Sequence, residues 1–104
     1  AQEVAMSIQL KSSARGYRLS LAGEIGYAQV NELYQVAQQI AKNPKPTTIE
    51  WENLHAIHYA GVQVLIALGK SLQNHNLPLR YKEPAPDLYA QLERYGLWQA
   101  MIES

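Results

Sequence analysis

The segment TTIEWENLHAIHYAGVQVLIAL, residues 47–68, contains a change of pattern that shows how the chain is organised. Its first five residues, TTIEW, are β-branched and apolar, which favours a short buried strand. Further on, Val62, Leu65, Ile66, Gly69 and Leu72 recur at helical spacing on one face. The sequence therefore predicts a strand over residues 47–51, a loop over 53–61 and a helix that starts at residue 60.

The junction IHYAG, residues 57–61, is an unusual start for a helix. It contains none of the Ser, Thr, Asp or Asn residues whose side chains usually accept a hydrogen bond from the first free backbone amides. His58 and Tyr59 stand there instead. In one interpretation backbone or water caps this helix; in the other, His58 and Tyr59 form a fixed apolar and hydrogen-bonding contact surface for a partner.

The segments before the junction extend the pattern. Apolar residues alternate across the polar turn SSARG, at Val4, Met6, Ile8, Leu10, Tyr17, Leu19 and Leu21. This alternation predicts two antiparallel strands. Residues 27–42 change to helical spacing, and Asn43 and Pro44 stop that helix. Since the strand at 47–51 follows a helix, a crossover connection and a parallel pairing are expected.

After the second helix, PLRYKE at 78–83 predicts a fourth strand, and residues 88–94 predict a short helix. Gly96 is a predicted left-handed helix stop, with Leu97 and Trp98 packing back and a last turn over 99–102. The predicted fold class is α/β, a four-stranded mixed sheet with helices mainly on one face. A chain of 104 residues is long enough for one core, so a single domain over 1–104 is expected.

Composition excludes several classes of function. Nine basic residues balance nine acidic ones, and a protein that grips nucleic acid needs a surplus of cations. The absence of cysteine removes disulfides and thiolate chemistry. The longest apolar run, VLIAL at 64–68, is too short to insert into a membrane. A cytoplasmic protein is expected.

No residue pattern indicates catalysis, a cofactor or a metal. His55 and His58 lie three residues apart, but the remaining histidine, His75, is at the far end of the helix, roughly 22 Å away at 1.5 Å per residue. No Ser is placed beside a base, and no glycine-rich phosphate loop is present. We therefore predict no catalytic residue, no metal ligand and no cofactor.

Three motifs resemble those of STAS domains, the family of bacterial anti-sigma factor antagonists and sulfate-transporter tails. They are LAGEI at 21–25, IEWENLHAIHYAGVQVL at 49–65 and APDLYAQLERYGL at 85–97. In that family the loop before the second helix usually carries Asp followed by a phosphorylated Ser or Thr. His58 occupies the Asp position here and Tyr59 the hydroxyl position. The resemblance thus implies a switch site at Tyr59 that is not expected to be phosphorylated.

The resemblance implies a non-enzymatic module that binds a protein partner through the loop and the exposed side of the second helix. The predicted partner-binding residues are His55, His58, Tyr59, Ala60, Gly61, Gln63, Val64, Ala67 and Leu68. At the junction two readings stay open: a switch that has been lost, or a fixed contact surface made by His58 and Tyr59. Formation of a homodimer also stays open.

Several settings fit such a module. The first is bacterial signalling linked to a chemotaxis-type histidine kinase. The second is the small STAS subunit that regulates the ATPase of a phospholipid-transport ABC system. The third is partner switching with an anti-sigma factor-like kinase, which the missing Ser disfavours. A small-molecule site formed by Trp51, Tyr59 and Trp98 is an alternative of another class.

Overall fold

The computed structural model describes residues 8–96 and residue 99. The elements are β1 (Ile8–Ser13), β2 (Gly16–Ile25), α1 (Tyr27–Lys42), β3 (Thr47–Ile57), α2 (Tyr59–Gln73), β4 (Leu79–Tyr81) and α3 (Pro86–Tyr95). This order is the predicted one. The expected alternation at Val4 and Met6, the packing of Leu97 and Trp98, and nearly all of the turn at 99–102 lie outside the described residues.

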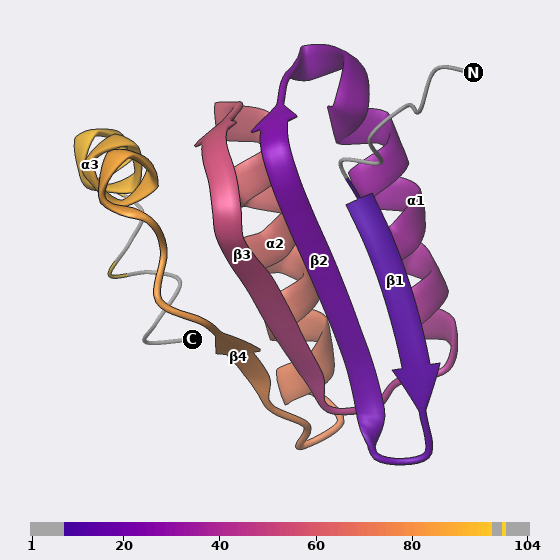
Figure 1. Ribbon diagram of the computed structural model, residues 1–104. Helices are drawn as coiled ribbons and strands as arrows, with labels where there is room; N and C mark the ends of the chain where they lie inside the picture. The colour runs from indigo at the N-terminus through magenta and orange to yellow at the C-terminus, as the bar shows by residue number, and fades with distance from the viewer. Residues whose placement is uncertain (1–7, 97–98, 100–104) are drawn as a thin grey trace.

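The four strands form one mixed sheet in the order β1-β2-β3-β4. β1 pairs antiparallel with β2, whereas β2–β3 and β3–β4 are parallel. Helices α1 and α2 lie side by side on one face of the sheet, and the opposite face is left open (Figure 1). The predicted fold class, with two crossover helices on one side, is confirmed.

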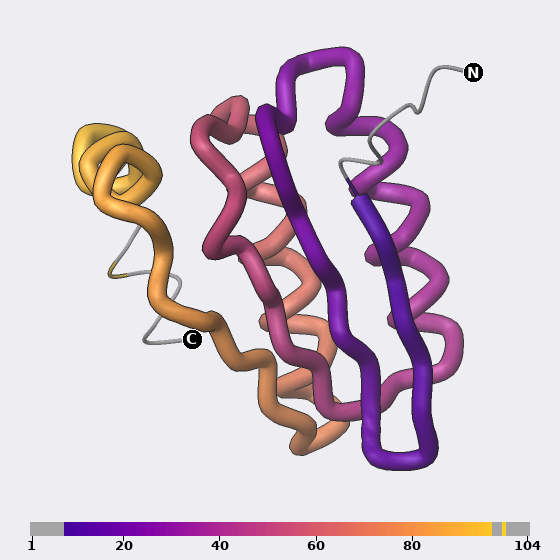
Figure 2. Tube along the Cα trace, viewed as in Figure 1, coloured from indigo at the N-terminus to yellow at the C-terminus, as the bar shows by residue number. Residues whose placement is uncertain are grey.

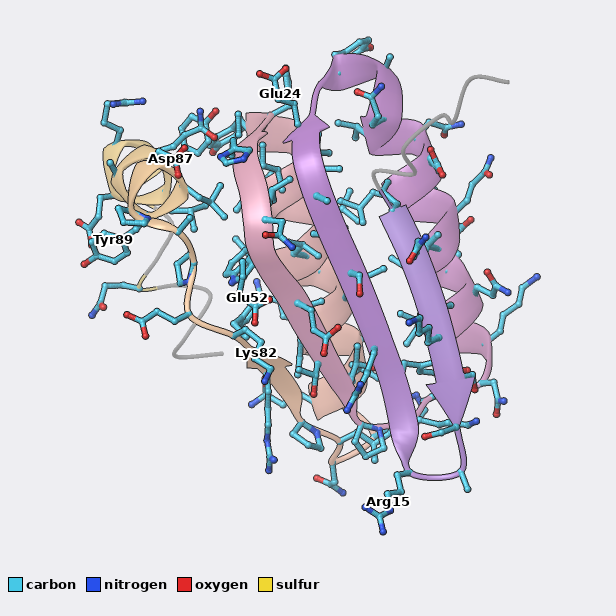
Figure 3. All side chains as sticks on the ribbon, viewed as in Figure 1. Arg15, Glu24, Glu52, Lys82, Asp87 and Tyr89 are labelled. Atoms are coloured by element: carbon cyan, nitrogen blue, oxygen red, sulfur yellow. The ribbon has the colours of Figure 1, made fainter. Side chains whose placement is uncertain are left out.

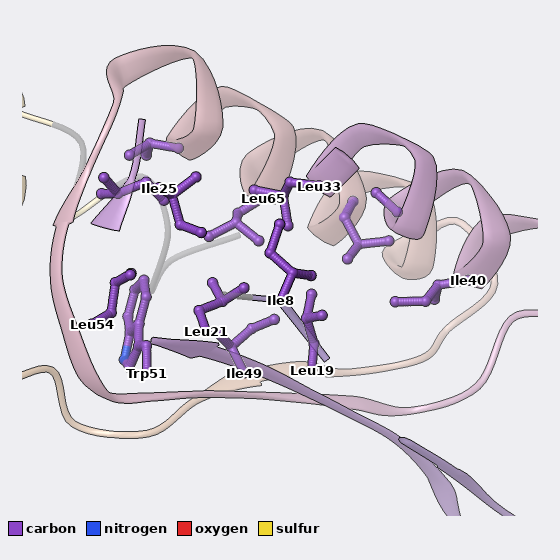
Figure 4. Packing of buried hydrophobic residues seen from close by; sticks show 14 of the residues in the cluster. Ile8, Leu19, Leu21, Ile25, Leu33, Ile40, Ile49, Trp51, Leu54 and Leu65 are labelled. Carbon is purple, nitrogen blue, oxygen red and sulfur yellow. The ribbon is translucent and has the colours of Figure 1, made fainter. Parts of the chain in front are cut away.

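The core lies between the sheet and the pair of helices (Figure 4). The alternate residues Leu19 and Leu21 of β2 are buried, as the period of a half-buried strand requires. They face Leu33 of α1 and Leu65 of α2, both of which are fully buried. Val64 and Leu68 make the apolar side of α2 wider than one face of the sheet can cover. Helix α1 packs against α2 and covers the part of that side that the sheet leaves free.

β3 is longer than predicted: it runs to Ile57, so the expected loop over 53–61 is wrong. The register with β2 shifts between Ser20 and Ala22 and again between Gly23 and Glu24. At each shift β3 has one residue more than β2. The buried positions after Trp51 are therefore Leu54 and Ile57, three apart instead of two.

β4 is short, and α3 takes over where it ends. β4 pairs only with Thr47, Thr48 and Ile49, and the chain then leaves the sheet edge (Figure 2). α3 packs beside the remaining half of β3, at the same edge (Figure 1). The helix ends at Gly96, which has φ 72° and ψ 21°, so the predicted left-handed stop is confirmed.

Candidate functional site

The start of α2 is held by the end of β3. The backbone N–H of His58 donates to the carbonyl oxygen of Ile25 over 2.7 Å, which continues the parallel pairing by one residue. The His58 Nδ1 atom accepts a hydrogen bond of 3.0 Å from the N–H of Ala60. The interpretation with a backbone or water cap is therefore wrong: His58 itself caps the helix, which begins at Tyr59 rather than at Ala60.

Aromatic rings surround this cap. The His58 ring makes an edge contact with Tyr27, the first residue of α1, at a centroid distance of 5.5 Å. The Tyr59 ring stands edge-on against Tyr95 of α3, also at 5.5 Å. Tyr27 is 79% exposed and Tyr59 is 47% exposed. Two aromatic pairs, Tyr27 with His58 and Tyr59 with Tyr95, thus flank the start of α2, and together they are called the aromatic surface.

Gly61 fits this junction for a packing reason. A Cβ atom at this position would lie 3.1 Å from Cγ1 of Ile57 and 3.5 Å from Cγ2 of Ile25. The distance to Ile57 is shorter than an ordinary van der Waals contact, whereas the distance to Ile25 is ordinary, so the absence of a side chain lets α2 approach the end of β3 closely. Gly61 is buried, and its predicted contact with a partner is therefore not a surface contact.

A groove runs between α1 and α2 on the outer side of the helix pair. One part, about 430 Å³, is lined by Tyr34, Ala37, Gln38, Ala41, Gln63, Val64, Ala67, Leu68 and Ser71. A second part, about 500 Å³, shares Tyr34 and Val64 with the first and extends to Tyr27 and Ala60. The groove therefore leads from Tyr27, at one side of the aromatic surface, along most of the length of the two helices.

The predicted residues of α2 occupy different depths in this groove. Gln63 and Ala67 are exposed on its rim, and Val64 is half-buried. Leu68 is only 3% exposed and belongs to the core, so its predicted exposure is wrong. Burial by α1 is the physical reason, since sequence spacing alone did not show that α1 packs there.

His55 does not join the other predicted residues. It lies on β3, where its Nδ1 atom is 3.1 Å from Oδ2 of Asp87, near the start of α3 (Figure 3 labels Asp87). This hydrogen bond lowers the pKa of the Asp87 carboxyl below its ordinary value of 3.8. His55 therefore helps to dock α3, while His58 caps α2.

Of the three aromatic residues named for a small-molecule site, the structure describes Trp51 and Tyr59. Trp51 is fully buried and stacks on Tyr81 with a centroid distance of 5.0 Å, and its indole N–H donates to the carbonyl oxygen of Lys82. Tyr59 instead contacts Tyr95. Trp98 lies outside the described residues. Trp51 thus belongs to the core, and burial of the stacked Tyr81 raises the pKa of the Tyr81 hydroxyl.

The sequence analysis missed the residues that α1 contributes. Tyr27 and Tyr34 are exposed, at 79% and 50%, and both line the groove. A signal was present, because the chain has seven Tyr and no Phe. Tyrosine is suited to half-exposed apolar contacts, since its ring packs while its hydroxyl stays in water.

Within residues 8–96 and 99, no group of three or more His, Cys, Asp or Glu side chains could hold an ion. No helix in that same part of the chain is both long and apolar enough to cross a bilayer.

A family model described as "Mlab, STAS domain" matches residues 8–103. No curated protein matches the chain. Among solved structures, the anti-sigma factor antagonist SpoIIAA in its unphosphorylated form is similar, with a TM-score of 0.74, 18% identity, and coverage of 86% of this chain and 81% of that one. The Bacillus cell fate determinant SpoIIAA in its phosphorylated form is also similar, with a TM-score of 0.70 and 17% identity. That match covers 86% of this chain and 84% of the other.

A structure described as Mglu is also similar, with a TM-score of 0.65 and 12% identity. It covers 79% of this chain, but the chain spans only 21% of that protein. At these identities the structural matches show a shared fold.

Proposed function

Because the chain belongs to the STAS domain family that the Mlab model describes, we propose that it is the small STAS subunit of a phospholipid-transport ABC system. In this proposal the whole chain, residues 1–104, is one STAS domain that works on the cytoplasmic side. It binds the ATPase subunit and regulates it without catalysing a reaction of its own. The contact is made by the start of α2 and the groove between α1 and α2.

The family match favours transport over signalling. The model is named for an Mla protein, and its match covers residues 8–103, nearly the whole chain. The similarity to SpoIIAA comes with 18% identity and speaks for the fold alone. Signalling through a histidine kinase, ranked first from the sequence, therefore becomes the second candidate.

The groove reaches Tyr27 and Ala60, directly beside the exposed ring of Tyr59 in sequence, and this is the observation that carries the proposed contact. Protein interfaces are enriched in tyrosine at their centres, and a helix of a partner with apolar residues on one side fits a groove between two helices. Gln38 and Gln63 lie at the groove and are uncharged. An apolar partner helix would therefore not have to desolvate a charge there.

The chemistry at position 59 supports a constant rather than a switched contact. A phosphorylated hydroxyl at a helix start adds about two negative charges and remodels an interface. Here the ring of Tyr59 packs against Tyr95, and Ala60 follows it. In the proposed complex the aromatic side chain supplies buried area in place of a modifiable hydroxyl.

Co-purification with the ATPase tests the proposal. We would co-express the chain with the ATPase of such a system, isolate the complex and measure ATP hydrolysis. Tyr59→Asp places a charge on the aromatic surface and is expected to weaken binding at least about tenfold, since one buried unpaired charge costs more than about 1.4 kcal/mol. Tyr89→Asp is the matched control, because Tyr89 is 43% exposed on α3, away from the groove.

The outcomes separate the candidates. If the ATPase copurifies with the parent and with Tyr89→Asp but not with Tyr59→Asp, the result supports both the transport function and the contact at the start of α2. If both variants bind as tightly as the parent, the site is wrong although the partner is right. If the ATPase is not retained and a histidine kinase or anti-sigma factor is captured from lysate, the signalling candidate replaces the transport reading.

A further inference from the structure

The open face of the sheet carries a row of basic side chains near the β1–β2 hairpin. Strand pairing places Lys11 opposite Arg18, Arg18 opposite Thr48, and Thr48 opposite Arg80. Residues directly opposite one another point to the same face of a sheet. The residues on either side of Arg18 are buried, so this row faces away from the core. Three cations therefore share one line across all four strands.

This arrangement costs stability. Like charges directly opposite each other, here Lys11 and Arg18, are destabilising in a sheet. The nearest compensation is Glu50, whose Oε2 lies 3.8 Å from Nε of Arg18. The Arg18 side chain is 70% exposed, and an ion pair of this kind contributes little. Because these like charges reduce the stability of the fold, the basic row is a candidate for a functional role.

A hollow of about 420 Å³ opens beside the row. Arg15, Arg18 and Arg80 line it, and no carboxylate of the described chain does. Another nearby cation, Lys45, is already engaged, since its Nζ lies 3.1 Å from Oγ of Ser12 and 5.1 Å from the centre of the Tyr17 ring. The three arginines are therefore the cations that line the hollow, and the ion pair of Arg18 with Glu50 is long and exposed on the arginine side.

The hollow lies at the end of the sheet opposite to the start of α2. Arg15 is at the hairpin, whereas Glu24 is at the other end of β2, close to α1 (Figure 3). The chain has no net charge, so the cluster reflects a separation of charge within the molecule. A ligand in the hollow and a partner at the α1–α2 groove would bind at the same time without touching each other's residues.

We propose that this basic hollow is a second docking surface, which takes an acidic segment of a protein partner. Guanidinium groups pair with carboxylates through two parallel hydrogen bonds, which suits a segment with several Asp or Glu residues. A membrane surface fits less well, because the exposed large apolar side chains of the described residues, Tyr27, Tyr34, Tyr59 and Tyr89, lie on helices instead of around the hollow.

Titration of the full chain with a hexaglutamate peptide tests this surface, with backbone amide shifts followed by NMR. We expect the largest shifts at Arg15, Arg18, Thr48 and Arg80. Replacing two arginines, Arg18→Gln with Arg80→Gln, is expected to weaken binding about tenfold or more, through loss of charge-assisted hydrogen bonds.

Lys42→Gln with Lys70→Gln removes the same charge from exposed positions on α1 and α2, and is expected to change affinity less than about twofold. Arg15→Gln, in the turn, serves as a second variant if the double arginine replacement does not fold. Equal losses in the arginine and lysine variants, or shifts spread over the helices, would overturn the proposal. Binding to anionic vesicles or to inorganic phosphate but not to the peptide would overturn it as well.

Discussion

The two halves of β3 differ in what holds them and in what they do. Residues 47–51 lie between β2 and β4 and alternate regularly between the core and the open face. Residues 52–57 pair with β2 across register shifts and meet α3 instead of a strand on the other side. Both halves contribute buried side chains to the core, Ile49 and Trp51 from the first and Leu54 and Ile57 from the second. Only the second half also delivers His58 to the start of α2.

At its edge away from β2, the second half of β3 is held by hydrogen bonds to side chains of α3, whereas the first half is held by backbone pairing with β4. The N–H of Ile57 donates to Oε1 of Gln91 over 2.7 Å, and the carbonyl oxygen of Ile57 accepts from the Tyr95 hydroxyl over 3.0 Å. α3 therefore satisfies the backbone polar groups at the end of the strand. Changes in the two halves should consequently have effects of different size and reach.

Trp51→Ala should have the largest effect, because it empties a fully buried site in the first half. Loss of a large aromatic side chain from a core costs about 3–5 kcal/mol. That is a large part of the roughly 5–15 kcal/mol that stabilises a typical domain. Urea unfolding followed by circular dichroism measures it, with Trp51→Phe as the milder control. A loss below about 1 kcal/mol would contradict the assignment of the core to this half.

Gln91→Ala should destabilise the chain by about 1–3 kcal/mol, since it leaves the N–H of Ile57 without its partner. The effect should be local. Amide hydrogen exchange should accelerate at Ile57 and stay unchanged at Ile49, which lies in the first half. Gln91→Glu keeps an acceptor oxygen and is the matched control. Equal acceleration at both amides would show that the halves do not behave separately.

His58→Ala should cost about 1 kcal/mol, the usual value of a side-chain cap at a helix start. His58→Asn supplies another cap and should stay within a few tenths of the parent. Thermal unfolding of the three proteins gives the comparison. If the alanine and asparagine variants are equally unstable, the imidazole contributes through its contact with Tyr27 instead of through the cap.

Asp87→Asn should have the smallest effect, and it should depend on pH. The hydrogen bond to His55 lowers the pKa of Asp87, so its contribution is present above the ordinary value of 3.8 and is lost as pH falls through the lower folded value. The melting temperatures of parent and variant should therefore differ slightly at pH 6 and converge as the pH falls below the folded pKa of Asp87. A difference that persists at low pH would show that the carboxylate charge is not the cause.

The same contrast explains which parts of the structure could be predicted from the sequence. The helix over 27–42 and the stop at Gly96 were predicted because apolar spacing and a left-handed glycine are local signals. The strand prediction ended at Trp51 because β3 has one extra residue at each of its two register shifts. Buried residues after that point recur every third residue, at Trp51, Leu54 and Ile57, instead of every second one. Strand irregularity depends on the partner strand, which the local sequence does not display.

The site was predicted in part for a related reason. The residues of α2 were found because they follow the junction in sequence. The cap by His58 was missed because histidine is seldom a cap, and the groove residues of α1 were missed because packing between helices is a tertiary property. Tyr27 and Tyr34 precede the junction by more than twenty residues and join it only in the folded chain.

The two register shifts also fix how many residues this part of the chain can contain. Deleting His55 would bring Leu54 and Ile57 to the regular spacing of two and would remove the second bulge, so the bend that leads β3 into the start of α2 would be lost. The hairpin turn at Ala14 and Arg15 has no such constraint, because insertions there leave both strands in register. Changes of chain length are therefore tolerated at one end of the sheet and forbidden at the other.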